Sequence, residues 1–222
     1  MLRDVWTILR KDWQAELRTQ EMAGSLLVFI LLIAFLFGLT FPARRDLVYF
    51  FPGLVWTAIF FAGMLGLSRS FAGEARSDCM KGLALAPLDR GAVFLGKLAS
   101  NLLFLVATEL VAVPLFFALF DFSPPGHWGT LVAALALGTL GFASVGTLLA
   151  AMMAGTKRGE FLLPLALFPL EMPVAVGAVE ATAGALGVAG AHAGHWLKLL
   201  VAYDLIFLVV PYLLFDYLME VL

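Results

Sequence analysis

The chain has 222 residues, of which 62% are hydrophobic and 14% charged, and its mean hydropathy is +0.98. So few polar side chains cannot coat a soluble globule of this size, so the composition excludes a soluble protein and predicts an integral membrane protein. The net charge of -2 comes without any basic patch, so no nucleic-acid partner is expected. The single cysteine, Cys79, excludes an intramolecular disulfide and paired-cysteine metal or haem-attachment motifs.

Residues 1–21 read as a helix lying along the membrane surface. Apolar side chains recur there at steps of three and four residues while most charged ones point elsewhere, and an apolar span follows directly. No short apolar core with a small-residue cleavage site is seen, so no removable signal peptide is expected. The apolar stripe consists of Leu2, Val5, Trp6, Leu9, Trp13 and Leu17.

Apolar runs long enough to cross a bilayer recur along the whole chain. A span needs about 20 residues at roughly 1.5 Å each, and alternating strands of the barrel type are absent. We therefore predict an all-α polytopic membrane protein with six transmembrane helices, forming a single permease domain over residues 1–222. The predicted spans are 22–41, 47–68, 91–120, 128–153, a fifth that begins after Gly159, and 196–218.

Residues 69–97 interrupt the apolar runs with charge and predict an elbow between the second and third spans. Its centre, within the loop 73–90, alternates charged and apolar residues and stops at Pro87, which indicates a short amphipathic helix. Asp89 stands at an N-cap position before the next span. A short surface helix between two spans is suited to docking on a soluble partner. The coupling candidates are Glu74, Arg76, Asp78, Lys81, Leu83, Leu85 and Pro87.

The basic residues predict the orientation. Of the 14 Lys and Arg residues, eleven fall before the first span, in the elbow or at Lys157 and Arg158, against three on the opposite side. Cytoplasmic loops carry the excess of positive charge, so the elbow and both termini are expected in the cytoplasm.

The fourth and fifth spans carry different packing signals. In the fourth, small residues at Thr139, Ala143, Thr147 and Ala151 form a ridge for close helix approach. The fifth contains prolines that interrupt a helical hydrogen-bond ladder. We expect it to break near the outer face, followed by a re-entrant or short outer helix, and we expect the next segment, residues 181–195, to cap the outer surface. The prolines are Pro164, Pro169 and Pro173.

No catalytic motif is convincing. Residues 91–98 have the spacing of a phosphate-binding loop, but Leu98 replaces the hydroxyl that would bind magnesium, and no strand precedes them. The chain is therefore expected not to be an enzyme, and any ATP is expected on another chain.

Three acidic residues within the spans are candidates for an intramembrane pathway: Glu109, Glu171 and Asp204. A charge in a span is costly and usually faces the protein interior or water. For Glu109 a protonated carboxyl bonded to a neighbouring helix is an equal alternative. Glu171, beside the predicted break, is expected to be exposed to water near the outer face. Asp204 has Lys198 and Tyr203 as candidate partners, and a hydrogen bond elsewhere within the bundle is the alternative.

Three histidines, His127, His192 and His195, fall on the predicted outer side. The last two share one face if their segment is helical, and they are weak candidates for haem or metal ligation. Solvated loop histidines are the alternative, and no metal site is predicted.

Several motifs together resemble the CcmB family, the permease of the cytochrome c maturation ABC transporter. The likeness extends over residues 1–222 in length and six-span layout, and it depends on the order and spacing of the motifs. Asp78 and Lys81 depart from the family's elbow pattern, which concerns the docking contacts. The residues that carry the resemblance are Pro52, Gly53, Trp56, Phe71, Glu74, Leu83, Leu85, Pro87, Lys97, Gly138, Gly141, Lys157, Arg158, Gly159, Leu162, Leu163, Pro169, Leu170 and Pro173.

The resemblance implies a multi-pass subunit of the bacterial inner membrane, paired with a second copy of itself and carried on two copies of a CcmA-like ATPase. CcmC-, CcmD- and CcmE-like partners are implied, with haem as a transferred ligand rather than a stably bound cofactor. The coupling helix would transmit the partner's ATP hydrolysis. The alternatives are a mechanical release factor that frees haem-loaded chaperone, an ABC-2-type exporter of another hydrophobic substrate, and an ion-coupled carrier that uses the three acidic residues.

Overall fold

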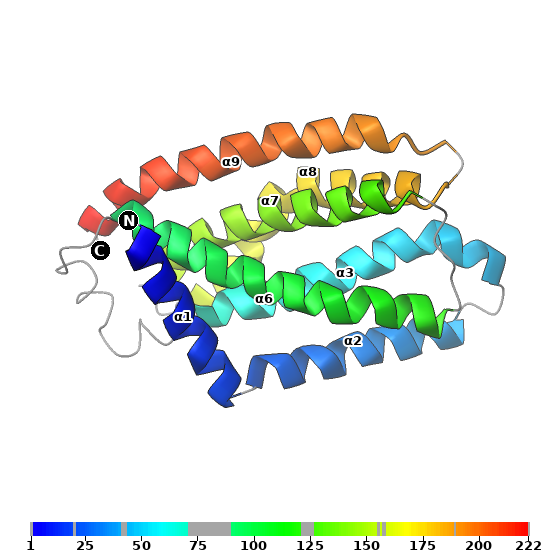
Figure 1. Ribbon diagram of the computed structural model, residues 1–222, viewed down its shortest axis with the longest axis horizontal. Coiled ribbons are helices and arrows are strands. Elements are labelled where there is room, and N and C mark those ends of the chain that lie inside the picture. The colour runs from blue at the N-terminus through cyan, green and yellow to red at the C-terminus, as the bar shows by residue number, and fades with distance from the viewer. Residues whose placement is uncertain are drawn as a thin grey trace.

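The computed structural model describes residues 2–19, 21–40, 44–70, 90–120, 127–154, 156, 159–188 and 190–221. These residues form helices joined by short turns, without any strand among them. Figure 1 shows α1 crossing one end of a bundle whose longer helices run side by side. We call this end the α1 end and the opposite one the far end. The helices are α1 (Leu2–Thr19), α2 (Glu21–Thr40), α3 (Arg44–Ser70), α6 (Arg90–Leu119), α7 (Trp128–Ala154), α8 (Gly159–Ala185) and α9 (Ala193–Val221).

Five stretches in the described part of the chain are long and apolar enough to cross a membrane. They agree with the predicted second to sixth spans, so the chain is a multi-pass membrane protein. The first predicted span corresponds to α2, whose apolar stretch among the described residues is the shorter Leu27–Thr40. The five stretches are Val48–Ser68, Gly91–Leu119, Trp128–Ala154, Phe161–Ala185 and Ala193–Phe215.

Helix α7 lies at the centre of the bundle, in contact with α3, α6, α8 and α9. The predicted ridge of small residues is almost fully buried, which confirms its role in packing. Large side chains of α3 also pack against two glycines of α7. A Cβ at Gly138 would lie 2.3 Å from the Trp56 ring, and one at Gly146 would lie 2.2 Å from Leu67. The missing side chains therefore let α3 approach α7 closely.

The predicted break in the fifth span is wrong, because α8 continues as one α-helix through Pro164, Pro169 and Pro173. Each proline removes one backbone donor, but in a membrane bundle neighbouring side chains and slight bending can compensate. Tyr203 of α9 donates a hydrogen bond to the carbonyl of Leu170 at 2.9 Å, within the proline-rich stretch. Within residues 181–195, which were expected to cap the outer surface, the described residues are the end of α8, a short connection and the start of α9, without a re-entrant or separate short helix among them.

Helix α8 ends instead at a glycine C-cap. Gly187 has a φ of 74°, and the amides of Gly187 and Val188 donate to the carbonyls of Gly184 and Ala183. This is the Schellman arrangement, in which a left-handed glycine turns the chain out of a helix. The short connection to α9 follows at the far end.

The start of α1 and the end of α9 both lie at the α1 end (Figure 1). Helix α3 ends there at Ser70 and α6 begins there at Arg90. Every described helix end next to the predicted elbow is therefore gathered at one end of the bundle.

Candidate functional site

The predicted coupling residues, Glu74 to Pro87, lie outside the described residues, as does Cys79. Their neighbours in the chain, Ser70 and Arg90, are at the α1 end. The elbow's helical form and contacts stay predictions.

The α1 end carries an ion pair between α1 and α6. Lys97 is 2% exposed, and its Nζ lies 3.1 Å from Oδ2 of Asp12, whose other oxygen lies 3.2 Å from Nζ of the more exposed Lys11. Ile8 of α1 sits against Gly96, where a Cβ would lie 2.9 Å from Ile8. Because a buried ammonium is unstable without an anion, Asp12 fixes α1 on the first turns of α6.

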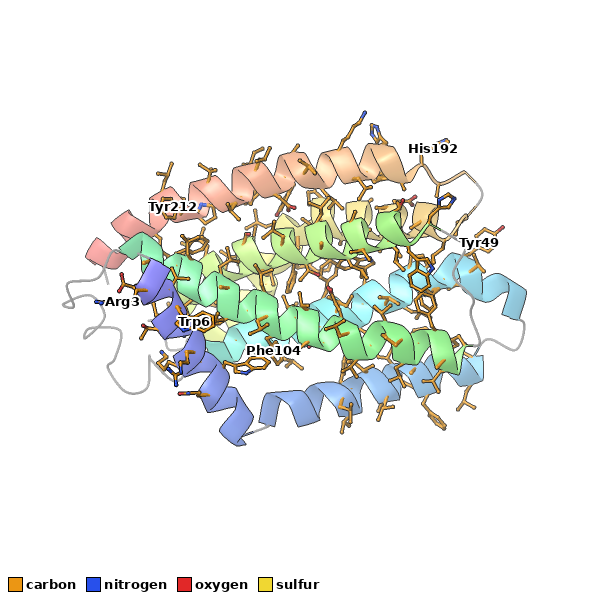
Figure 2. All side chains as sticks on the ribbon, in the orientation of Figure 1. Arg3, Trp6, Tyr49, Phe104, His192 and Tyr212 are labelled. Carbon is orange, nitrogen blue, oxygen red and sulfur yellow. The ribbon has the colours of Figure 1, made fainter. Side chains whose placement is uncertain are left out.

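This seating refines the predicted surface helix. Ile8 is buried against α6, whereas Trp6 and Trp13 of the predicted apolar stripe are 63% and 37% exposed. Figure 2 shows Arg3 and Trp6 at the α1 end. The two indoles are free to meet a membrane surface, as amphipathic aromatic rings commonly do. Residues 91–98 lie wholly within α6, so they do not form a phosphate-binding loop.

Two polar pairs join α6 to α7. Thr139 Oγ1 donates a hydrogen bond to Oε1 of Glu109. Asn101 Nδ2 donates to Oγ1 of Thr147 at 2.9 Å. The helices are antiparallel, so the two pairs lie at successive levels of one interface. Glu109 is thus a buried carboxyl bonded to a neighbouring helix, one of the two alternatives that the sequence left open.

Trp56 of α3 forms a third buried interhelical bond, donating from Nε1 to Oγ1 of Thr182 in α8 at 2.9 Å. Its ring fills the notch at Gly138 between these helices. Trp56 was recognised from the sequence only as part of a motif. A buried indole needs an acceptor, but the identity of that acceptor, 126 residues away, carries no local signal.

Glu171 of α8 and Asp204 of α9 are each 5% exposed, so the expected exposure of Glu171 to water is wrong. None of their four carboxyl oxygens has a hydrogen-bond partner in the described part of the chain. Asp204 therefore pairs with neither Lys198, which is exposed, nor Tyr203, whose hydroxyl donates to Leu170. Oδ1 of Asp204 lies 2.7 Å from the position that a Cβ on Gly141 would take. These two carboxyls are the least satisfied polar groups of the described core.

The histidines are at the far end, where Figure 2 labels His192. His127, His192 and His195 are all exposed. His192 precedes α9, so the condition for a face shared with His195 is not met, and His195 packs edge-on against Trp196 at 5.9 Å between ring centroids. Among the described residues no three His, Cys, Asp or Glu side chains gather as a metal site would require. Haem ligation by these residues stays a prediction.

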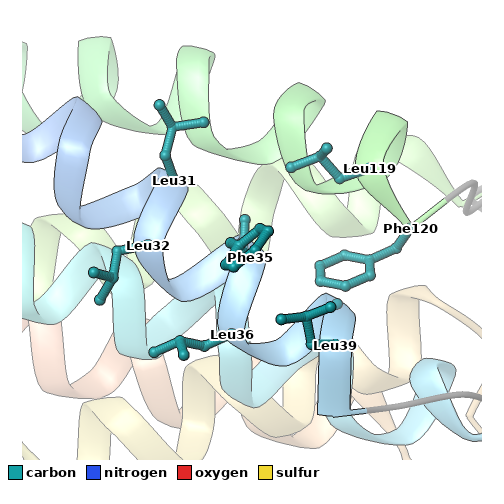
Figure 3. Close-up of a pocket in the computed structure, with 9 residues that line it drawn as sticks. Leu31, Leu32, Phe35, Leu36, Leu39, Leu119 and Phe120 are labelled. Carbon is teal, nitrogen blue, oxygen red and sulfur yellow. The ribbon is translucent and has the colours of Figure 1, made fainter.

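An apolar groove of about 720 Å³ lies between α2 and the end of α6 (Figure 3). It offers hydrocarbon contact and almost no polar surface, so it suits lipid chains or another apolar helix. Its lining residues are Leu31, Leu32, Ala34, Phe35, Leu36, Gly38, Leu39, Leu119 and Phe120.

Comparison with known proteins links this architecture to one family. The family described as "CcmB protein" matches residues 3–216. The heme exporter protein B of Pseudomonas aeruginosa is 34% identical over 194 residues, 85% of this chain and 84% of the relative. The same-named protein of Paracoccus denitrificans is 33% identical over 202 residues, 89% of this chain and 90% of its own length. That of Rhodobacter capsulatus is 32% identical over 186 residues, or 82% and 84%.

Proposed function

Because this chain belongs to the CcmB protein family, we propose that it is the permease subunit of an ABC transporter that acts in haem export or delivery for cytochrome c maturation. The observation that carries the proposal is the family match over residues 3–216, which extends from α1 into α9. ATP hydrolysis would take place on a partner subunit. The chain itself would change shape rather than catalyse a reaction.

The α1 end is the side on which the ATPase would dock. Helix α3 ends and α6 begins there, so the segment with Glu74, Asp78 and Lys81 is tethered at that end. A force on this segment would pass directly into α3 and α6. Through the pairs Asn101–Thr147 and Glu109–Thr139 it would continue to the central helix α7.

The proposed membrane is the bacterial inner membrane, with the α1 end in the cytoplasm. The excess of Lys and Arg in the segments before α2, between α3 and α6, and between α7 and α8 supports this orientation. Helix α2 would be the sixth span, since its 20 residues reach roughly 30 Å. The common end of the two termini supports an even number of crossings.

A second candidate function is the mechanical release of a haem-loaded chaperone without haem passing through this subunit. The interlocked core favours it: Trp56 fills the notch at Gly138, and Phe142 meets the notch at Gly63, where a Cβ would lie 2.3 Å from its ring. Such packing transmits displacement between helices better than it opens a route between them. The proposed partners are the same in both cases: a CcmA-like ATPase, CcmC-, CcmD- and CcmE-like proteins, and a second copy of this chain.

The test is charge reversal at the elbow, Glu74→Lys with Asp78→Lys and Lys81→Glu. The triple variant should lose co-purification with the ATPase or its stimulation of ATP hydrolysis, together with cytochrome c yield. Lys198→Glu, on the exposed face near the far end, is the matched control and should leave all three unchanged. Full ATPase activity and cytochrome c yield in the triple variant would refute the docking proposal.

Haem transport separates the two functions. Vesicles with the purified complex, supplied with haem on one side, should accumulate it at a rate that follows ATP hydrolysis if the complex is an exporter. ATP-dependent release of chaperone without haem accumulation would favour the release function.

A further inference from the structure

Glu171 and Asp204 bring two carboxyl groups together inside the bundle. They belong to different helices, α8 and α9, which meet at this level: Tyr203, next to Asp204, donates a hydrogen bond to the carbonyl of Leu170, next to Glu171. They lie about 11 to 14 residues from the far ends of their helices, roughly 16 to 21 Å along the axis. The pair is therefore deep in the membrane-spanning part of the protein.

In the described part of the chain, no positive group pairs with these two carboxyls. Lys198 is the one Lys or Arg in the sequences of α7, α8 and α9, and it is exposed. In α3 and α6 the basic residues fall within eight residues of a helix end, and Lys97 is bound to Asp12. The neighbouring titratable groups are also engaged: Tyr203 donates to Leu170, and Glu109 accepts from Thr139 on the α6 side of α7.

Two negative charges cannot persist side by side in such surroundings. Like charges in one site repel, and each carboxylate that leaves water loses its hydration without gaining a donor. A metal ion would need more ligands than two carboxyls, and the described residues supply no cluster of three. A proton needs only the two carboxyls themselves.

We propose that Glu171 and Asp204 form a proton-binding site that shares one exchangeable proton between α8 and α9. With the proton held by either carboxyl, the pair carries a single negative charge. When the proton leaves to water, two negative charges face each other across the interface and push the helices apart. The inference concerns the chain alone and does not depend on the proposed role in haem delivery.

Infrared spectroscopy of the purified protein in lipid nanodiscs tests the site. Wild type should show a carboxylic-acid C=O band that shifts in D₂O and disappears as the pH becomes alkaline. The double variant Glu171→Gln with Asp204→Asn should lack this band, and the control Glu109→Gln should keep it. Identical spectra for wild type and the double variant in this region, or a band that neither exchanges nor responds to pH, would overturn the proposal.

A milder variant guards against loss of folding in the double variant. Gly141→Ala keeps both carboxyls and places a methyl group 2.7 Å from Oδ1 of Asp204, so the band should shift in frequency. Gly177→Ala is the matched control, because its methyl group would meet only leucine side chains, the nearest at 3.1 Å. If the frequency of the band does not change in Gly141→Ala, the proton is not held at Asp204 and Glu171.

Discussion

Helix α6 and the α8–α9 interface treat buried polar groups in opposite ways. Each of Lys97, Asn101 and Glu109 on α6 has a partner on another helix, respectively Asp12, Thr147 and Thr139. Glu171 and Asp204 have none among the described residues. The polar groups of α6 therefore hold helices together, whereas the two carboxyls at the α8–α9 interface are buried without a hydrogen bond from the described residues to offset their lost hydration. Burial alone does not distinguish the two kinds of group.

The largest expected effect comes from breaking the ion pair at the α1 end. Asp12→Ala removes the carboxylate that pairs with the buried ammonium of Lys97. It should lower the free energy of unfolding by about 3 kcal/mol, the low end for a broken buried pair, because Asp12 is partly exposed. Thermal denaturation in detergent measures this. Lys11→Ala removes the exposed partner of the same carboxylate and should cost less than about 1 kcal/mol. If both variants lose the same free energy of unfolding, Asp12 does not stabilise the protein through the buried Lys97.

A second variant would leave Glu109 of α6 without a hydrogen-bond partner among the described residues, as Glu171 and Asp204 are at the α8–α9 interface. Thr139→Val removes the donor to Glu109 and should destabilise the protein by about 1 to 3 kcal/mol, because a buried carboxyl loses its hydrogen bond. The variant should also gain an infrared carboxyl signal that Glu109→Gln removes. Thr139→Ser, which keeps the hydroxyl, is the control and should behave like wild type in that spectrum.

A smaller effect is expected for the bond between Asn101 and Thr147. A double-mutant cycle with Asn101→Leu and Thr147→Val should give a coupling of about 0.6 kcal/mol, and at most about 1.7, as is usual for interhelical bonds in membranes. Unfolding in a denaturing detergent provides the four free energies. A coupling of zero would show that the two side chains do not meet in the membrane.

The smallest effect should come from Glu171→Leu. No hydrogen bond is lost, so stability near neutral pH should be unchanged or slightly higher. The same denaturation assay applies, with Glu109→Leu as the matched variant on α6, which should be clearly destabilised. If both substitutions destabilise alike, Glu171 has a partner equivalent to Thr139 and the comparison fails.

The helices themselves were largely predictable, because long apolar runs with aromatic or charged flanks leave little freedom. The predicted span 128–153 corresponds to α7, Trp128–Ala154. The continuity of α8 through Pro164, Pro169 and Pro173 was not predictable in this way. The cost of a proline depends on contacts that relieve it, such as the bond from Tyr203 to Leu170, and these come from another helix.

The candidate site was predictable in its members but not in their pairing. A carboxyl within an apolar span is conspicuous, so Glu109, Glu171 and Asp204 were all identified. Whether such a group meets Thr139 or a second acid depends on how each helix is rotated, which the local sequence does not determine. Asp12 and Lys97 were visible only as charges near the membrane surface. Their pairing requires the crossing of α1 over α6.

The seating of α1 on α6 gives the surface helix a mechanical meaning. Ile8 and Asp12 hold it to the turn that contains Gly96 and Lys97, while Trp6 and Trp13 turn outward. A tilt of α6 would therefore drag two anchored indoles through the lipid headgroups. Viscous and elastic resistance of the bilayer would then oppose such a tilt, and its strength would depend on lipid composition.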